Sequence, residues 1–138
     1  MKYAKILHSN GASLDRKVGD YSPLIVSSQY NHCNIINYLL TKGANIEQTG
    51  EYGETSLHMA IQRGSFAAVQ LLCERGANIE HLTVNGLSPL FSACIRGHQQ
   101  QALDIVKYLV SKVMLFRQNP MMQLNNFFGK IRSSTAHN

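Results

Sequence analysis

Residues 53–79, GETSLHMAIQRGSFAAVQLLCERGANI, decide the fold of this 138-residue chain. Their pattern predicts two short helices, a tight turn between them, and a loop that begins at a glycine. A second copy follows this stretch and a looser copy precedes it, so that the evenly spaced Leu24, Leu57 and Leu90 hold one position of a repeat. A regular repeat of this kind indicates an array of stacked units, each of which contacts its neighbours.

The ends of the predicted helices have local causes. A hydroxyl side chain precedes each first helix and can accept a backbone N–H of the first turn. Proline follows it in two repeats, at the helical position that tolerates it best. A small residue within each first helix lets the neighbouring first helix approach. Each first helix then ends at a residue suited to the left-handed conformation. In chain order these positions are Ser22, Thr55 and Ser88; Pro23 and Pro89; Ser27, Ala60 and Ala93; and Asn31, Gly64 and Gly97.

The central repeat carries a family resemblance. It is similar to an ankyrin repeat, for which a 33-residue period and a T-P-L-H-x-A signature are typical. The residues that carry the similarity are Thr55-Ser56-Leu57-His58-x-Ala60, Gly64, Val69, Leu71-Leu72 and Gly76-Ala77-Asn78. The resemblance covers residues 1–112. It implies an all-α solenoid of helix-turn-helix units joined by hairpin-like loops, divided into a half-repeat at 1–16 and repeats at 17–48, 49–81 and 82–112.

Both ends of the array depart from this pattern. Residues 3–11 match only a second helix and its glycine, so we expect either a longer array or a cover from outside the chain. Repeat three has four extra residues after Gly97. Its second helix is expected to end in Ser111-Lys112-Val113, where the other repeats have glycine and alanine.

Residues 113–138 form a basic tail beyond the repeats. Asn119-Pro120 is a helix start signal, and an amphipathic helix is predicted at 120–132. Its apolar stripe consists of Met121, Leu124, Phe128 and Ile131, with Phe127 beside them. Three interpretations stay open: a capping helix on the open face of repeat three, a disordered or non-native tail, or a basic helix that binds a membrane or a partner.

Most of the net charge of +5 comes from the C-terminal residues 111–138. Residues 1–110 hold nine Lys or Arg against eight Asp or Glu, whereas 111–138 hold four basic residues and no acid. The repeats therefore give no indication of nucleic-acid binding.

The cysteines and the hydropathy pattern bear on the cellular setting. Cys33, Cys73 and Cys94 are an odd number at helical positions, which favours a reduced protein in the cytoplasm, with the nucleus open. Cys73 takes the place that Leu40 has one repeat earlier, so we expect a small hydrophobe there. We expect no signal segment before the first repeat, and no apolar run has the length of a membrane span.

The sequence offers no catalytic or metal-binding constellation. Cys94 and His98 are four residues apart but lack the two further ligands of a zinc site. No glycine-rich phosphate loop is present. Glu51 and Glu54 are expected to be solvated, and His58 to tie loops together by hydrogen bonds. We predict no catalysis, no cofactor, no metal and no small-molecule ligand.

Binding by a surface remains. The resemblance implies that the loop tips and the exposed side of each first helix, on the concave face of the stack, bind a protein partner. Tyr and Arg are enriched among interface hot spots, which ranks Tyr30, Tyr52, Arg63 and Arg96 first. The full set is Tyr30, Glu51, Tyr52, Glu54, Met59, Gln62, Arg63, Asn85, Leu87, Ile95 and Arg96, with Val26, Gln29 and Ser92 on the same side.

We therefore predict a non-enzymatic interaction module or adaptor. Two alternatives stay open because fold alone does not give function. One is a membrane-associated adaptor that uses the tail, and the other is the targeting arm of an enzyme whose catalytic domain lies outside this chain.

Overall fold

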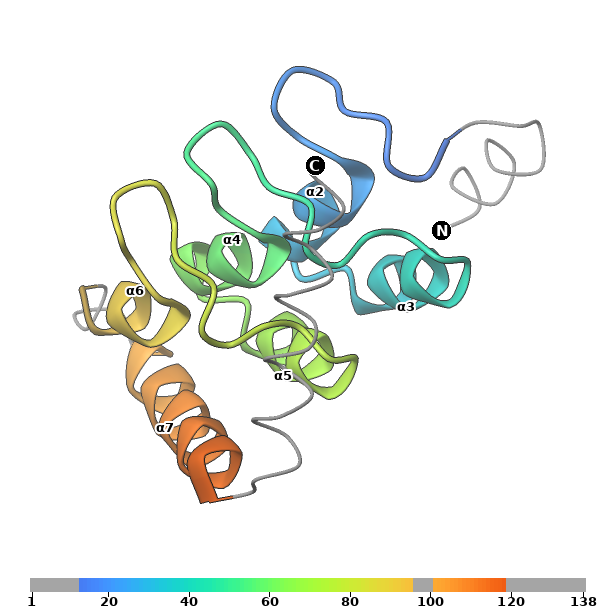
Figure 1. Ribbon diagram of the computed structural model, residues 1–138. Helices are drawn as coiled ribbons and strands as arrows, with labels where there is room; N and C mark the ends of the chain where they lie inside the picture. The colour runs from blue at the N-terminus through green and yellow to red at the C-terminus, as the bar shows by residue number, and fades with distance from the viewer. Residues whose placement is uncertain (1–12, 96–100, 119–138) are drawn as a thin grey trace.

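The computed structural model describes residues 13–95 and 101–118, and these residues form six α-helices (Figure 1). The only strand-like feature among them is an isolated bridge between Val18 and Tyr21. The predicted half-repeat at 1–16 lies largely outside the described residues, and the predicted helix at 120–132 lies wholly outside them. The helices are α2 (Pro23–Gln29), α3 (Cys33–Thr41), α4 (Ser56–Arg63), α5 (Phe66–Glu74), α6 (Pro89–Ile95) and α7 (Ala102–Gln118).

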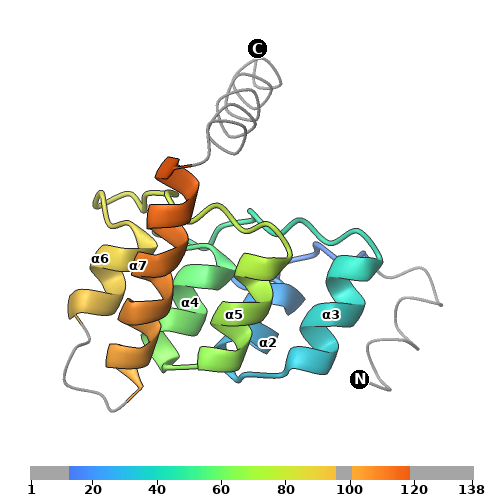
Figure 2. The same cartoon turned by 90° about the horizontal axis from the view of Figure 1, so that it is seen from below.

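The helices pair and the pairs stack, as the repeat predicts. The first helices α2, α4 and α6 form one layer, and the second helices α3, α5 and α7 form the other (Figures 1 and 2). Long loops join the pairs and project on the side of the first helices (Figure 1). The predicted all-α solenoid is confirmed.

The predicted N-caps are present in all three repeats. The Ser22 hydroxyl accepts the Ile25 N–H at 3.3 Å, and the Ser88 hydroxyl accepts the Phe91 N–H at 3.2 Å. Thr55 forms a capping box, because its hydroxyl accepts the His58 N–H while the His58 ring accepts the Thr55 N–H. Each cap satisfies amide groups that the first helical turn leaves without partners.

The turns between paired helices require the left-handed conformation. Gly64 ends α4 with φ 69°, and Asn31 follows α2 with φ 61°. Asn31 has a second function, because its side-chain oxygen accepts the Ala68 N–H at 3.0 Å and so links repeat one to the start of α5. Gly97, the third residue of this set, lies outside the described residues.

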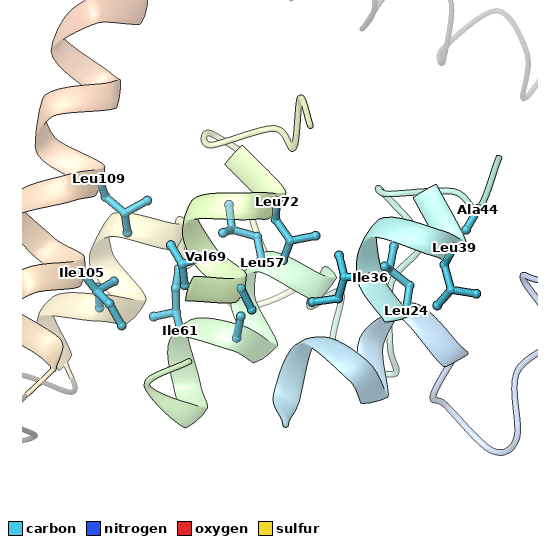
Figure 3. Packing of buried hydrophobic residues seen from close by; sticks show 13 residues of the cluster. Leu24, Ile36, Leu39, Ala44, Leu57, Ile61, Val69, Leu72, Ile105 and Leu109 are labelled. Carbon is cyan, nitrogen blue, oxygen red and sulfur yellow. The ribbon is translucent and has the colours of Figure 1, made fainter. Parts of the chain in front are cut away.

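The core lies between the two layers and runs through all three repeats (Figure 3). Leu24 and Leu57 supply its first-helix side, and Leu72 and Leu109 supply its second-helix side. The small residues Ser27, Ala60 and Ala93 are buried, which brings neighbouring first helices close together.

The second helix of repeat three is longer than predicted. It runs for 17 residues to Gln118, whereas α3 and α5 have nine residues each. The expected end at Ser111-Lys112-Val113 is therefore wrong, and the helix crosses the boundary that the sequence suggested after 112. Gly43 and Gly76, with φ 96° and 91°, follow α3 and α5. No glycine stands at the corresponding place in repeat three, so the backbone continues as a helix.

Candidate functional site

The candidate binding surface is the concave face, which we define as the loops at 17–21, 49–54 and 82–87 together with the exposed sides of α2, α4 and α6. Its two later loops are joined by their backbones. The Val84 N–H donates to the Tyr52 carbonyl at 2.9 Å. A Cβ added at Gly53 would lie 3.1 Å from the Val84 nitrogen, and Gly53 has φ 77°. Glycine suits this contact best, because φ is positive and an added Cβ would crowd the Val84 backbone.

Tyr52 is held at the tip of its loop from both sides. Its carbonyl accepts from Val84, and its N–H donates to the Glu54 carboxylate at 3.1 Å. Glu54 is half-buried, and its own carbonyl accepts the Gly50 N–H at 2.9 Å. Glu54 is therefore only partly solvated, as its carboxylate also accepts a hydrogen bond that shapes the loop. Glu51 is exposed, as expected.

His58 connects the cap of α4 to the loop of the next repeat. Its Nδ1 lies 3.0 Å from the Thr55 hydroxyl, and its Nε2 lies 3.1 Å from the Leu87 carbonyl oxygen. The side chain is buried, and this burial lowers the pKa of His58 below 6.5. The predicted role of His58 in tying loops together is confirmed, and it is a structural role.

Tyr30 and Arg63 hold the same position of successive repeats and lie together on the concave face. The guanidinium carbon of Arg63 is 5.8 Å from the centroid of the Tyr30 ring, within the range of a cation–π contact. Both side chains remain exposed. Beneath them, the buried Ser65 hydroxyl donates to the Gln29 carbonyl at 2.9 Å, which fixes the spacing of the two repeats.

The predicted binding residues divide by exposure. The exposed set is Val26, Tyr30, Glu51, Tyr52, Arg63, Asn85 and Ile95, and the half-buried set is Gln29, Glu54, Gln62 and Leu87. Met59 and Ser92 are buried. Arg96 lies outside the described residues.

Met59 is the largest departure from the predicted surface. Its side chain is 8% exposed, because α4 has a first helix on each side. The expectation that Met59 lies on an exposed helix face is therefore wrong. Ser92, which holds the same repeat position in α6, is also buried.

The loop-tip residue Val84 also belongs to this face, although the predicted set lacks it. It is 69% exposed and holds the repeat position that Glu51, a selected residue, has in the repeat before. Val18 holds the same position one repeat earlier than Glu51 and is also exposed. The repeat register was the signal that could have found both of them.

The part of the chain that the structure describes contains no cluster of His, Cys, Asp and Glu able to hold a metal ion. Within the same residues, no helix combines the length and apolar character needed to cross a membrane. Burial raises the pKa of the Cys73 thiol to about 11, in agreement with its predicted role as a small hydrophobe.

The sequence matches known repeats over most of its described length. Residues 45–120 match the family described as ankyrin repeats in three copies, and residues 19–51 match a single ankyrin repeat. The chain belongs to the ankyrin repeat family. Ankyrin repeat membership and the relatives below indicate a protein–protein interaction module.

Three relatives show what this ankyrin repeat chain is similar to. It is 35% identical over 89 residues to protein fem-1 homolog A-like of Mus musculus, covering 64% of this chain and 13% of that protein. It is 35% identical over 91 residues to glycerophosphocholine phosphodiesterase GDE1 of Candida albicans, covering 64% and 7%. It is 30% identical over 100 residues to ankyrin repeat and SOCS box protein 11 of Homo sapiens, covering 72% and 31%. The chain thus spans less than a third of each relative.

Proposed function

We propose that this ankyrin repeat chain is a non-enzymatic adaptor that binds a protein partner through its concave face. One observation carries the proposal: exposed aromatic and arginine side chains from successive repeats lie on this face, with Tyr30 and Arg63 in contact. Tyrosine and arginine are the residue types on which interface affinity concentrates.

The hydrogen bonds within the face support the same proposal. Tyr52 is held through its N–H and its carbonyl, and His58 and Ser65 fix the spacing between repeats. Side chains on a backbone that is already ordered lose less conformational entropy when they bind. The exposed loop residues Val84 and Asn85 extend this face beyond Tyr52.

The test compares two matched double variants by quantitative capture from a lysate, followed by titration of each captured protein in purified form. Tyr52→Ala with Arg63→Ala removes two exposed side chains of the concave face. Glu74→Ala with Lys107→Ala removes two exposed side chains of the second helices. We expect the first variant to lose about 30-fold in affinity or more, which corresponds to one hot spot of about 2 kcal/mol. The second variant should bind as the parent does.

Helical circular dichroism and urea midpoints of both variants serve as folding controls. Equal binding by the first variant and the parent, with both folded, would rule out the concave face as the binding surface. Equal losses of affinity in both variants would show that binding does not depend specifically on the concave face.

A second candidate function is the targeting arm of a larger enzyme. The observation that favours it is the match to GDE1, a phosphodiesterase by name, of which this chain spans 7%. The genomic sequence on both sides of the reading frame tests this alternative. A catalytic domain continuous with residue 1 or residue 138 would establish it, and stop codons on both sides would exclude it.

The membrane-associated adaptor remains the third alternative and rests on the basic tail alone. Flotation of the full chain with anionic liposomes, compared with the variant Lys130→Glu with Arg132→Glu, tests it. Equal flotation of the two proteins would remove the tail from consideration.

A further inference from the structure

Repeat three ends in an apolar face that the earlier repeats keep covered. Phe91 holds the repeat position of Ile25 and His58. Those two side chains are fully buried, and His58 contacts the following repeat. Phe91 is 56% exposed. The position therefore faces the place where a following repeat would stand, and α6 and α7 lie at one end of the array (Figure 2).

α7 contributes the rest of this face. Leu103 and Val110, 58% and 38% exposed, hold the positions of Phe66 and Cys73 in α5. Phe66 packs edge-on against Tyr108 of the next repeat, with 5.9 Å between ring centroids. Leu103 must therefore face outward from the last repeat. We define the end face as Phe91, Cys94, Leu103, Val110 and Met114, all of which are exposed.

Cys94 belongs to this face by the same comparison. It holds the position of Ser28 and Ile61, which are both buried. The sequence places an apolar or small residue at this position in every repeat, yet only in repeat three is it exposed. Exposed apolar side chains that gather on two contacting helices, as on α6 and α7, indicate an interaction site.

The length of chain that follows α7 identifies the occupant. α7 ends at Gln118, and residues 119–138 follow. The outward row of α7 from Leu103 to Met114 is about 17 Å long, and a helix over 120–132 would be about 20 Å long, at about 1.5 Å per residue. Asn119 and Pro120 can form the two-residue connection of an antiparallel helix pair, with the first full turn of the tail helix beginning at Met121. The tail has the apolar stripe needed to match the row: Met121, Leu124, Phe128 and Ile131.

We propose that residues 120–132 fold back as a helix on the end face and cover it. In this arrangement Phe128 packs beside Val110, and Leu124 packs beside Met114. The antiparallel register also brings Arg132 opposite Val106, about 3 Å along the axis from Asp104, the only acidic residue of α7. The tail then occupies the place where a further repeat or a second copy of the chain would stack. This inference is independent of what the concave face binds.

Cys94 provides the readout, in a full chain with Cys33→Ser and Cys73→Val. The rate at which its thiol reacts with Ellman's reagent measures how well the end face is covered. Leu124→Asp with Phe128→Asp places charge in the stripe of the tail. Gln123→Asp with Asn126→Asp adds the same charge outside the stripe. We expect the first pair to raise the rate about tenfold by opening the face, and the second pair to leave it near the parent rate.

Equal rates in the parent and the stripe variant would overturn the proposal. A rate in the parent that falls with protein concentration, together with a dimer mass by light scattering, would assign the face to a second copy and also overturn it. A stripe variant that unfolds does not prevent the test, because crosslinking answers the same question. Val110→Cys with Phe128→Cys, otherwise free of cysteine, should be joined within one chain by a short bis-maleimide. Val110→Cys with Asn126→Cys should not, and equal yields in the two variants would contradict the proposal.

Discussion

The Nε2 of His58 in repeat two lies 3.1 Å from the carbonyl oxygen of Leu87 in repeat three. The tautomer follows from the other nitrogen. The Thr55 N–H donates to Nδ1, so the ring proton is on Nε2 and is donated to Leu87. One buried side chain thus completes a helix cap and joins two repeats.

Replacement of His58 by alanine should destabilise the array. The change removes the bond to Leu87, breaks the capping box and leaves a cavity, so we expect a loss of about 2–4 kcal/mol in the free energy of unfolding. Urea denaturation followed by circular dichroism measures it. His32→Ala is the matched control, because His32 is exposed and makes no side-chain cap bond. A loss under about 0.5 kcal/mol for His58→Ala would show that the link between repeats contributes little.

Stability should also fall as the solution becomes mildly acidic. Burial lowers the pKa of His58 in the folded chain and the charge of His81 adds to the shift, while the hydrogen bonds to the Leu87 and His81 backbones and the charge of Glu54 oppose it. Between the unfolded value near 6.5 and the lower folded value, the unfolded chain binds more protons. The contribution of His58 is therefore complete above about pH 6.5 and is lost as the pH falls through the folded pKa.

Urea midpoints at pH 7.5, 6.5 and 5.5 measure this effect in the parent and in His58→Gln. The glutamine variant should be less stable at pH 7.5 and should lose less on acidification. Parallel pH curves for the two proteins would assign the acid sensitivity to other groups.

The sequence predicted the features that are determined within a single repeat and by its position in the 33-residue period. The caps at Ser22, Thr55 and Ser88 and the left-handed turns at Asn31 and Gly64 are local, and each has a single physical cause. The role of His58 was predictable too, because the resemblance supplied it. The hydrogen bond between the Glu54 carboxylate and the Tyr52 N–H was not predicted, because it depends on a loop geometry that the sequence pattern does not encode.

Features that depend on neighbouring repeats were harder to predict. The exposed side of a first helix depends on how closely its neighbours pack, so Met59 was expected at the surface and is buried. The contact of Arg63 with Tyr30 needs the spacing between repeats as well as the register. The C-terminal end of α7 could not be predicted, because no glycine near residue 112 ends the helix. The absence of such a residue does not indicate where the helix stops instead.

Asn31 should contribute through its backbone and its side chain separately. Its φ of 61° costs most other residues energy, and its side-chain oxygen accepts the Ala68 N–H. Asn31→Gly relieves the backbone but loses the hydrogen bond, so we expect a loss of about 1 kcal/mol. Asn31→Ala loses the bond and adds strain, so the loss should be about 2 kcal/mol.

Urea denaturation of both Asn31 variants distinguishes these contributions. A glycine variant as stable as the parent would mean that the bond to Ala68 adds no net stability. An alanine variant as stable as the glycine variant would mean that the turn is not strained.

Ser56→Pro should stabilise the chain. Ser56 is the first residue of α4, where the backbone N–H has no partner within the helix, and the other two repeats have Pro23 and Pro89 at this position. Thr55, which would precede the new proline, is already extended at φ −83° and ψ 173°, as a residue before proline should be. Pro89 is fully buried, so the stacked repeats accommodate the ring.

The serine hydroxyl adds a second reason for this gain. Ser56 Oγ is buried and makes no hydrogen bond, which is a cost that the substitution removes. The proline ring also restricts the unfolded chain, which adds about 0.4–1 kcal/mol to the free energy of unfolding. Ser56→Ala separates the two effects, because it removes the hydroxyl without fixing φ. We expect the unfolding free energy to rise in the order parent, alanine, proline, and a proline variant below the alanine variant would show that the ring does not fit between repeats one and three.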